Sequence, residues 1–376
     1  MMIGFDAKRA AQNKTGLGNY SRFVIEALTR FAPNERYLLY IPNPNRTSSL
    51  NGIEKANNVE LRYPQTTFWK KFRSLWRVWG ITSDIEKENI RLFHGLSNEL
   101  PLNIRKAENT RSIVTIHDLI FLRYPEYYHY IDRKIYAYKF RKACQNADRI
   151  IAVSECTKRD IISFFHIPEE KIDVVYQGCD AQFKQAVPEN TKEGIRRKYQ
   201  LPQRYILYLG SIESRKNLLL IAKALLHIQE PITVIAIGKR TPYAETVEDF
   251  LRKNHLENRM RLLSNIPFKE LPAFYQMATT FVYPSFFEGF GIPLLEALNS
   301  GVPAIGATGS CLEEAGGPHS IYIHPEDDKG LAKAIEQTLT DQSLRERMIK
   351  EGKKYALLFE EEKLTKDLLN VYRKTI

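Results

Sequence analysis

Cysteine is scarce in this sequence, and the few cysteines are far apart. Only four occur among 376 residues, at Cys144, Cys156, Cys179 and Cys311. Their spacing matches neither a disulfide framework nor a cysteine-based metal site. We therefore expect reduced thiols, which favours a cytoplasmic protein over a secreted one.

Long apolar runs are also lacking. No uninterrupted apolar stretch approaches the roughly 18 residues that suggest a membrane-spanning helix. The chain begins directly with the strand-like MIGFDA, without the basic and apolar regions of a signal peptide. Internal repeats and low-complexity tracts are missing as well. The sequence predicts a globular protein without a leader or a membrane span.

The charge is positive and unevenly distributed. The net charge is +11, and residues 1–185 contain 29 Lys and Arg against 20 Asp and Glu, a net of +9. Residues 186–376 contain 26 against 24, a net of +2. This balance suits anionic small molecules or an anionic membrane surface, although composition alone favours a solvated basic surface without a partner. No nucleic-acid reading motif accompanies the charge, so nucleic acid is not an expected partner.

Short β-branched or aromatic runs alternate with helical stretches, which predicts parallel sheets built from βαβ units. The polar, strandless stretch 181–203 separates two such series, so we expect domains at residues 1–185 and 186–357 and a final helix at 358–376. The expected strands are MIGFDA, YLLYIP, VELRYP, RLFHGL, SIVTIHD, RIIAVS and KIDVVYQG in the first series, and YILYLGSI, ITVIAIG, MRLLSN, TTFVYPS and VPAIGAT in the second.

The segment FVYPSFFEGFGIPLLEALNSGVPAIGATG, residues 281–309, sets Glu288 and Glu296 in an apolar run punctuated by glycine. A strand ends before EGFG turns the chain, and Pro293 suits the first turn of the helix that follows. Both carboxylates could accept hydrogen bonds from the hydroxyls of a nucleotide-sugar, although a helix with a favourable acidic first turn is the simpler alternative. Backbone N–H groups at the helix start would suit a phosphate, and they belong to Gly289, Phe290, Gly291 and Ile292.

A second motif joins two cations to a strand end. In YILYLGSIESRKNLLLIAKAL the strand ends at Gly210, and Arg215 and Lys216 precede an amphipathic helix. A guanidinium and an ammonium at such a junction suit a diphosphate. An exposed basic pair without a ligand is the alternative.

The first half carries weaker candidates. Gly16 and Gly18 precede a helix and would let a ligand approach the backbone closely, although they do not form the dinucleotide fingerprint G-x-G-x-x-G. His117 ends the strand SIVTIHD, where it could hydrogen-bond a sugar or transfer a proton. A histidine that only caps its loop is the alternative.

Together these motifs resemble the retaining GT-B glycosyltransferases of family 4. EGFGIPLLE resembles their E-x7-E signature, and the glycine loop, the HD pair, the Arg-Lys pair and the closing FEEEKLTKDLLNVY match in order over nearly the whole chain. The resemblance implies an α/β fold of two Rossmann-like, doubly wound domains facing a central cleft, with the C-terminal helix crossing back to the first domain. It implies an enzyme that moves a hexose from a nucleoside diphosphate-sugar to a hydroxyl of a glycan or lipid-linked acceptor, with retention and without a metal or other cofactor.

The resemblance also implies roles for the candidate residues. Glu288 would contact the donor sugar, Glu296 the ribose, and His117 would lie beside the donor sugar. We therefore expect His117 and Glu288 to be catalytic. The donor-binding set would be Gly16, Gly18, Arg215, Lys216, Gly289, Phe290, Gly291, Ile292 and Glu296.

Two other functions share this architecture. A GT-B epimerase would release sugar without an acceptor, and a non-catalytic subunit would bind nucleotide only. The phrase HDLIFLRYPE resembles polysaccharide mannosyltransferases, which indicates GDP-mannose as donor and surface polysaccharide as product.

The segment FWKKFRSLWRVWG, residues 68–80, combines aromatic and basic residues at helical spacing. Such a segment suits peripheral contact with the anionic inner face of a membrane, and a core-packing helix is an equal alternative. Its cations would be Lys70, Lys71, Arg73 and Arg77.

Overall fold

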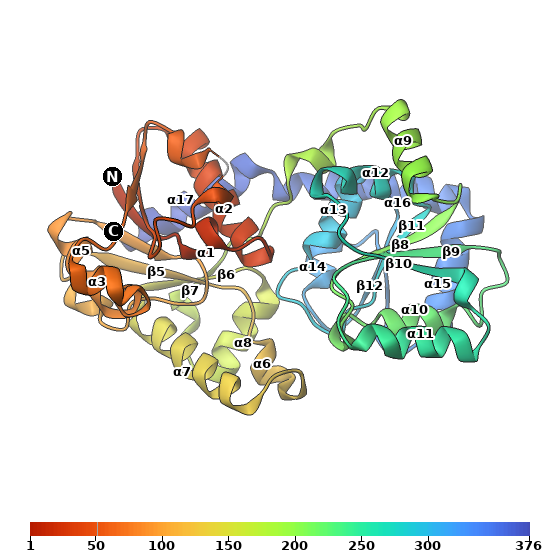
Figure 1. Ribbon diagram of the computed structural model, residues 1–376, viewed down its shortest axis with the longest axis horizontal. Helices are drawn as coiled ribbons and strands as arrows, with labels where there is room; N and C mark the ends of the chain where they lie inside the picture. Colours follow the sequence, from red (N-terminus) through yellow and green to blue (C-terminus); the bar gives the residue numbers. More distant parts are fainter. Residues whose placement is uncertain (51) are drawn as a thin grey trace. The chain divides into compact units, whose positions relative to one another are not determined.

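The computed structural model describes residues 1–50 and 52–376, which divide into two compact units (Figure 1). Unit 1 comprises Met1–Gln177 and Glu360–Ile376, and unit 2 comprises Gly178–Phe359. We expected the first boundary after residue 185, which is eight residues later than observed. We expected the second after residue 357, which is two residues earlier than observed. The strandless stretch 181–203, in which we placed the domain boundary, contributes helix α9 (Glu189–Tyr199) to unit 2.

Unit 1 is built on seven parallel strands in the order β3-β2-β1-β4-β5-β6-β7. All seven strands expected in this half are confirmed, and their side chains are largely buried because helices cover the sheet. The strands are β1 (Met2–Asp6), β2 (Arg36–Tyr40), β3 (Val59–Arg62), β4 (Leu92–Gly95), β5 (Arg111–Ile116), β6 (Arg149–Ala152) and β7 (Ile172–Val174). The helices are α1 (Lys8–Gln12), α2 (Gly16–Phe31), α3 (Thr67–Lys71), α4 (Arg73–Leu75), α5 (Ile81–Lys87), α6 (Ile120–Arg123), α7 (Tyr130–Asn146), α8 (Glu155–Phe165) and α17 (Glu361–Thr375).

Unit 2 is built on six parallel strands in the order β10-β9-β8-β11-β12-β13. The five expected strands are confirmed, and the sixth, β13, was not expected. The strands are β8 (Tyr205–Leu209), β9 (Thr233–Ile237), β10 (Met260–Leu263), β11 (Thr280–Tyr283), β12 (Ala304–Ala307) and β13 (Ile321–Ile323). The helices are α9 (Glu189–Tyr199), α10 (Leu218–Ala224), α11 (Tyr243–Lys253), α12 (Leu271–Met277), α13 (Ile292–Ser300), α14 (Leu312–Gly316), α15 (Asp328–Thr340) and α16 (Gln342–Ala356).

Each sheet reverses its strand order once, beside its first strand. The reversal lies between β1 and β4 in unit 1 and between β8 and β11 in unit 2. Open α/β sheets bind ligands beyond the carboxyl ends of the strands at such a reversal. The loops after these four strands are therefore the places to look for a site.

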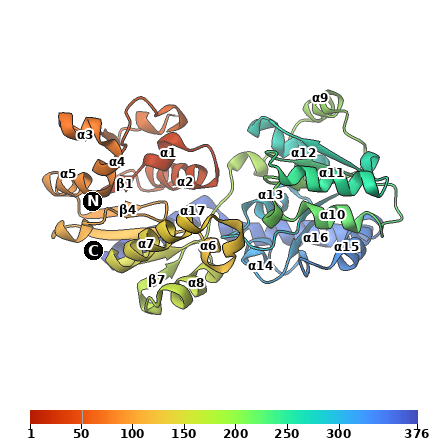
Figure 2. The ribbon, with the colours of Figure 1, turned by 60° about the horizontal axis from the view of Figure 1, so that its bottom comes forward.

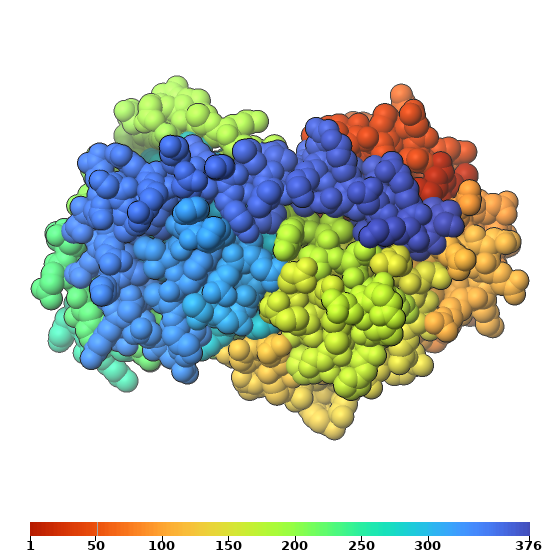
Figure 3. All heavy atoms as spheres, turned by 180° about the vertical axis from the view of Figure 1, so that it is seen from behind, coloured from red at the N-terminus to blue at the C-terminus, as the bar shows by residue number. Residues whose placement is uncertain are grey.

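The end of the chain returns to unit 1. The final helix expected at residues 358–376 is present as α17, and the 3-10 turn Leu357–Phe359 separates it from α16. Helix α17 packs against α2, and its buried Tyr372 hydroxyl lies 2.7 Å from His94 Nδ1 on β4. In Figure 3 this dark blue helix lies beside the yellow-green residues of the same unit, where Lys374 Nζ is 3.1 Å from Asp173 Oδ1.

The basic aromatic segment folds differently from the single helix expected. Residues 76–80 form a π-helical turn after α4, and this turn directs two side chains inward. Trp76 is fully buried and donates to Asp84 Oδ2 at 2.7 Å. Arg77 is paired with Asp6 and Glu99, both at 2.6 Å, so its expected role as a membrane-facing cation is wrong.

Within the part of the chain that the structure describes, no helix has both the length and the apolarity needed to cross a membrane.

Candidate functional site

The loops after β8 and β11 are joined by direct hydrogen bonds. Asn217, which follows the short turn Ser214–Lys216, adopts a left-handed conformation (φ 59°) and donates to Pro284 O at 3.1 Å and to Pro325 O at 2.7 Å. The Phe286 N–H also donates to Arg215 O at 2.9 Å. These bonds hold Arg215 and Lys216 beside the loop that contains Glu288.

One oxygen of Glu288 collects four polar groups. Its Oε1 accepts hydrogen bonds from Tyr283 Oη at 2.8 Å and Ser285 Oγ at 2.9 Å. Arg215 Nη1 lies 3.0 Å and Lys216 Nζ 3.5 Å from the same atom. The other oxygen, Oε2, has no partner among residues 1–50 and 52–376, so it is available to a ligand hydroxyl.

The charge of Glu288 is fixed by these neighbours. Burial would raise the pKa of the carboxyl, but the cations Lys216 and Arg215 and the hydrogen bond from Tyr283 lower it to about 2. Glu288 is therefore ionised across the physiological range. A carboxylate aimed at a sugar hydroxyl accepts a charge-assisted hydrogen bond.

The two cations have different surroundings. Arg215 is anchored in the protein, because it donates to Glu213 Oε1 at 2.8 Å and to the Phe287 carbonyl in addition to its pair with Glu288. Lys216 donates to Tyr283 Oη at 2.7 Å. Arg215 thus holds the loop of Glu288 in place. Lys216 makes fewer contacts within the protein, so it would lose fewer of them on binding a phosphate.

The helix after EGFG starts at Ile292, one residue before Pro293, the expected first helical residue. Gly291 caps α13 with φ 115°, and a Cβ at this position would lie 2.8 Å from Leu312 Cδ2. Both the positive φ and the close packing require glycine. The α13 N-terminus has no side-chain cap, so its positive dipole end is not satisfied by a side chain of its own capping residue.

Glu296 lies deeper, on α13. The residue is 7% exposed, and its Oε2 accepts from Tyr275 Oη at 2.9 Å. Burial raises its pKa to about 8 despite that hydrogen bond, and the charge of Asp180 acts in the same direction as burial. Glu296 therefore binds a proton at neutral pH in the free protein.

Replacing Glu296 with Gln should stabilise the protein at alkaline pH. The folded state keeps a proton that the unfolded state releases above its ordinary pKa of 4.5, so the wild-type free energy of unfolding falls as the pH rises from there through about 8. Gln carries no such cost and can still accept from Tyr275. The melting temperature of the variant should exceed that of the wild type by several degrees at pH 8, corresponding to about 2–4 kcal/mol, and by much less at pH 5. An equal difference at both pH values would contradict the buried, protonated carboxyl.

His117, in unit 1, is held on both ring nitrogens. Nε2 donates to Leu96 O at 2.9 Å, and Nδ1 faces Gln177 Nε2 at 3.4 Å. Burial lowers the pKa of His117 to about 4, although the bond to Leu96 acts in the opposite direction. The neutral ring suits a hydrogen-bonding role better than that of a proton donor at pH 7.

The glycine pair lies at the start of α2 in the same unit. Gly18 is required by packing, since a Cβ there would lie 1.9 Å from Asn13 O, whereas Gly16 has open space around it. Tyr20, on the first turns of the same helix, contacts the His117 ring edge-on at a centroid distance of 4.6 Å. Unit 1 thus brings the glycine loop and His117 together, and unit 2 brings Arg215, Lys216 and Glu288 together.

Sequence reasoning missed three hydroxyl groups of the site. Tyr283 and Ser285 flank Pro284 at the end of β11, shortly before EGFG, so their place at a strand end was a usable signal. Tyr275 reaches Glu296 from α12, 21 residues earlier, and no local pattern marks it.

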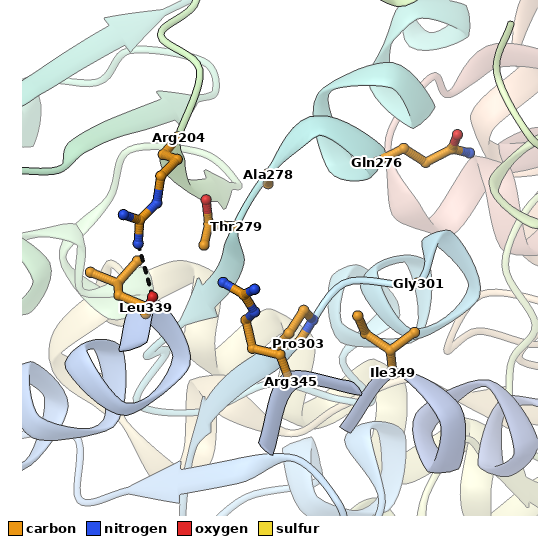
Figure 4. A pocket seen from close by; sticks show the side chains of 9 residues that line it. All are labelled: Arg204, Gln276, Ala278, Thr279, Gly301, Pro303, Leu339, Arg345 and Ile349. Carbon is orange, nitrogen blue, oxygen red and sulfur yellow. Dashed lines mark hydrogen bonds between the residues drawn. The ribbon is translucent and has the colours of Figure 1, made fainter. Parts of the chain in front are cut away.

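A cavity of about 610 Å³ lies at the opposite edge of the unit 2 sheet (Figure 4). Arg204, Thr279 and Pro303 line it from positions directly before β8, β11 and β12. It is therefore at the amino ends of the strands, away from the candidate site. The described residues also contain no cluster of three or more His, Cys, Asp or Glu side chains placed for one metal ion.

Comparisons with known proteins agree with this architecture. The family descriptions Glycosyltransferase Family 4 and Glycosyl transferases group 1 match residues 23–183 and 191–355. O-antigen chain mannosyltransferase B of Escherichia coli is 32% identical over 392 residues, covering 99% of this chain and all of the relative. Serotype-specific mannosyltransferase WbdA of Escherichia coli is 30% identical over 68% of this chain and 32% of its own length.

Solved structures show the same fold. Anabaena HepE (Alr3699), solved in complex with UDP and glucose, superposes with a TM-score of 0.76 at 16% identity, covering 99% of both chains. The fold and site therefore define a GT-B glycosyltransferase. The chain belongs to glycosyltransferase family 4, whose members are retaining enzymes that use a nucleotide-sugar donor and a glycan acceptor.

Proposed function

We propose that this enzyme transfers mannose from GDP-mannose to a hydroxyl of a glycan or lipid-linked acceptor during surface-polysaccharide synthesis. The observation that carries the proposal is the full-length similarity to O-antigen chain mannosyltransferase B. It supports this function over a nucleotide-sugar epimerase or a non-catalytic subunit. The charged set of Arg215, Lys216 and Glu288 also argues for an intact catalytic site.

The donor would be held mainly by unit 2. Lys216 and the N-terminus of α13 would bind the diphosphate, with Arg215 bracing the loop between them. The free Oε2 of Glu288 would accept from a sugar hydroxyl, and Glu296 from the ribose. The resemblance to family 4 also assigns His117, Gly16 and Gly18 of unit 1 to the donor.

Retention would follow from attack on the face that the leaving group vacates. The bond between the anomeric carbon and the diphosphate oxygen breaks, and the acceptor oxygen bonds to the same face of that carbon. A departing phosphate oxygen would take the acceptor's proton, which fits the neutral His117. Lys216, Arg215 and the α13 N-terminus would stabilise the negative charge that develops on the leaving diphosphate, without a metal ion or another cofactor.

GDP should raise the melting temperature more than UDP or ADP does. A nucleotide that binds only the folded state stabilises it by mass action, by about 2.7 kcal/mol at a concentration one hundred times its Kd. Thermal unfolding with each nucleotide tests the donor base. Turnover of GDP-mannose with and without a polysaccharide acceptor extract then separates transfer from epimerisation. A larger shift with UDP would contradict the assigned donor.

Unit 1, which would bind the acceptor, would meet the inner leaflet of the membrane. The structure leaves part of the basic aromatic segment exposed, and we call this part the first surface. Its members are Phe68, Lys70, Lys71, Phe72, Leu75 and Trp79. Aromatic and basic side chains together suit the interface of an anionic bilayer.

A further inference from the structure

Helix α7 of unit 1 exposes large apolar side chains to an unusual degree. Tyr130, Ile131 and Tyr138 are 66%, 70% and 56% exposed, and Ile135 is 45% exposed. Only the opposite side of the helix is buried in unit 1, through Phe140, Ala143 and Cys144. Contiguous exposed apolar side chains of this size mark an interaction surface.

The same helix is strongly basic. It carries five cations, Arg133, Lys134, Lys139, Arg141 and Lys142, against the single acid Asp132, which gives a net charge of +4. Lys134 Nζ lies 5.3 Å from the centre of the Tyr130 ring, so apolar and cationic groups share one face instead of separating. The partner must therefore offer apolar contact and negative charge together.

Helix α7 is linked through one acidic residue to the turn 76–80, which contains Trp79 of the first surface. Glu99 joins them, because it pairs with Arg77 of the turn 76–80 at 2.6 Å and approaches Lys139 of α7 at 3.7 Å. In Figure 2 the yellow helix α7 runs along the outside of unit 1. Of the sixteen large apolar side chains exposed among the described residues, nine belong to the first surface and α7.

We propose that α7 is a second docking surface of unit 1, and that its partner is an anionic lipid bilayer. Exposed tyrosines and isoleucines would enter the interfacial region, and Lys134, Arg141 and Lys142 would contact lipid phosphates. The inference deepens the membrane contact of the proposed function and rests on it. It assigns to α7 a binding role that neither the donor site nor the first surface requires.

A second copy of this chain fits α7 poorly. A symmetric pair would place the same helix against itself, bringing a charge of +4 against +4 with one acid on each side. A bilayer that contains anionic lipid supplies the opposite charge and an apolar interior at once.

The test is co-sedimentation with vesicles of phosphatidylglycerol and phosphatidylcholine in equal amounts, and with vesicles of phosphatidylcholine alone, at low salt. The α7 variant carries Ile131→Ser, Ile135→Ser, Tyr138→Ser, Lys134→Gln and Lys142→Gln. Its affinity for the anionic vesicles should fall at least about ten-fold, with donor hydrolysis and far-ultraviolet circular dichroism unchanged. A unit 2 control, Lys350→Gln with Lys354→Gln, removes the same charge and should bind as the wild type does.

A fourth protein separates the two membrane proposals. The first-surface variant carries Lys70→Gln, Lys71→Gln, Phe72→Ser and Trp79→Ser. If it loses vesicle binding while the α7 variant binds as the wild type does, the inference about α7 is overturned and the first surface stands. If the wild type ignores anionic vesicles at low salt, both membrane proposals fail, and the donor assignment is unaffected.

A label gives a direct reading of contact. The four native cysteines are buried, so Ile131→Cys offers one accessible thiol for an environment-sensitive fluorophore. Its emission should shift to shorter wavelength with anionic vesicles and stay constant with neutral ones. Unchanged emission under conditions in which the protein sediments with vesicles would overturn the inference. Concentration-dependent self-association that the α7 substitutions abolish would assign the surface to a second copy and overturn it as well.

Discussion

Replacing Lys216 with Ala should lower kcat at least about thirty-fold and lower the melting temperature by less than Arg215→Ala does. Loss of a charge-assisted contact to a leaving diphosphate raises the activation free energy by about 2 kcal/mol or more. Glu288 loses the nearby charge of Lys216, but it keeps its bonds to Tyr283 and Ser285 and its pair with Arg215. The matched control is Lys223→Ala, which removes the same charge from an exposed position on α10.

Arg215→Ala should behave differently from Lys216→Ala. Arg215 is paired with Glu288 and Glu213 inside the protein, so its removal leaves a buried carboxylate without its closest cation. Breaking a buried pair in this way costs about 3–5 kcal/mol of stability. We therefore expect loss of both activity and melting temperature for Arg215→Ala, measured by donor turnover and thermal unfolding. Near-normal turnover in both variants would refute the proposed diphosphate site. Turnover that requires a divalent metal ion and is abolished by EDTA would refute it as well.

Substitution of the two glutamates should change different kinetic constants. Glu288→Gln should lower kcat about thirty-fold or more, because its Oε2 would contact the sugar where positive charge develops in the transition state. Glu296→Gln should mainly raise the KM for the donor and the Kd for GDP, since contacts to the ribose are alike in the ground and transition states.

Steady-state kinetics over a range of donor concentrations, with GDP binding by calorimetry, measure this division. Because the pKa of Glu288 is low, the pH dependence of the wild-type kcat should contain no step from this residue between pH 5 and 9. Equal increases of KM in both variants, with kcat untouched, would disprove the assignment.

The sequence was sufficient for most of the fold because parallel strands buried on both faces leave continuous apolar runs. Strand β13 (Ile321–Ile323) was not predicted, and its pairing with β12 in the folded unit is what identifies it as a strand. The inward turn of Trp76 and Arg77 escaped for another reason. Helical spacing shows which residues share a face, but only the packed structure shows which face is buried, and the π-helical turn 76–80 shifts the faces.

The candidate site shows the same division between local and tertiary information. Glu288, Arg215 and Lys216 could be proposed because each lies in a motif at the end of a strand. The partners that set their chemistry could not be read in this way. Tyr275 meets Glu296 only because α12 and α13 pack together, and Gln177 meets His117 across 60 residues of sequence.

The return of α17 to unit 1 has a consequence for biosynthesis. Unit 2 is continuous in the chain and is complete once Phe359 has left the ribosome, whereas unit 1 still lacks its last helix. Tyr372 closes a buried series of polar groups, from its hydroxyl through His94 and Thr115 to Tyr20, which contacts His117. The part of the protein made first is therefore finished last, and a chain released a few residues early would carry a complete unit 2 beside a unit 1 with an open core.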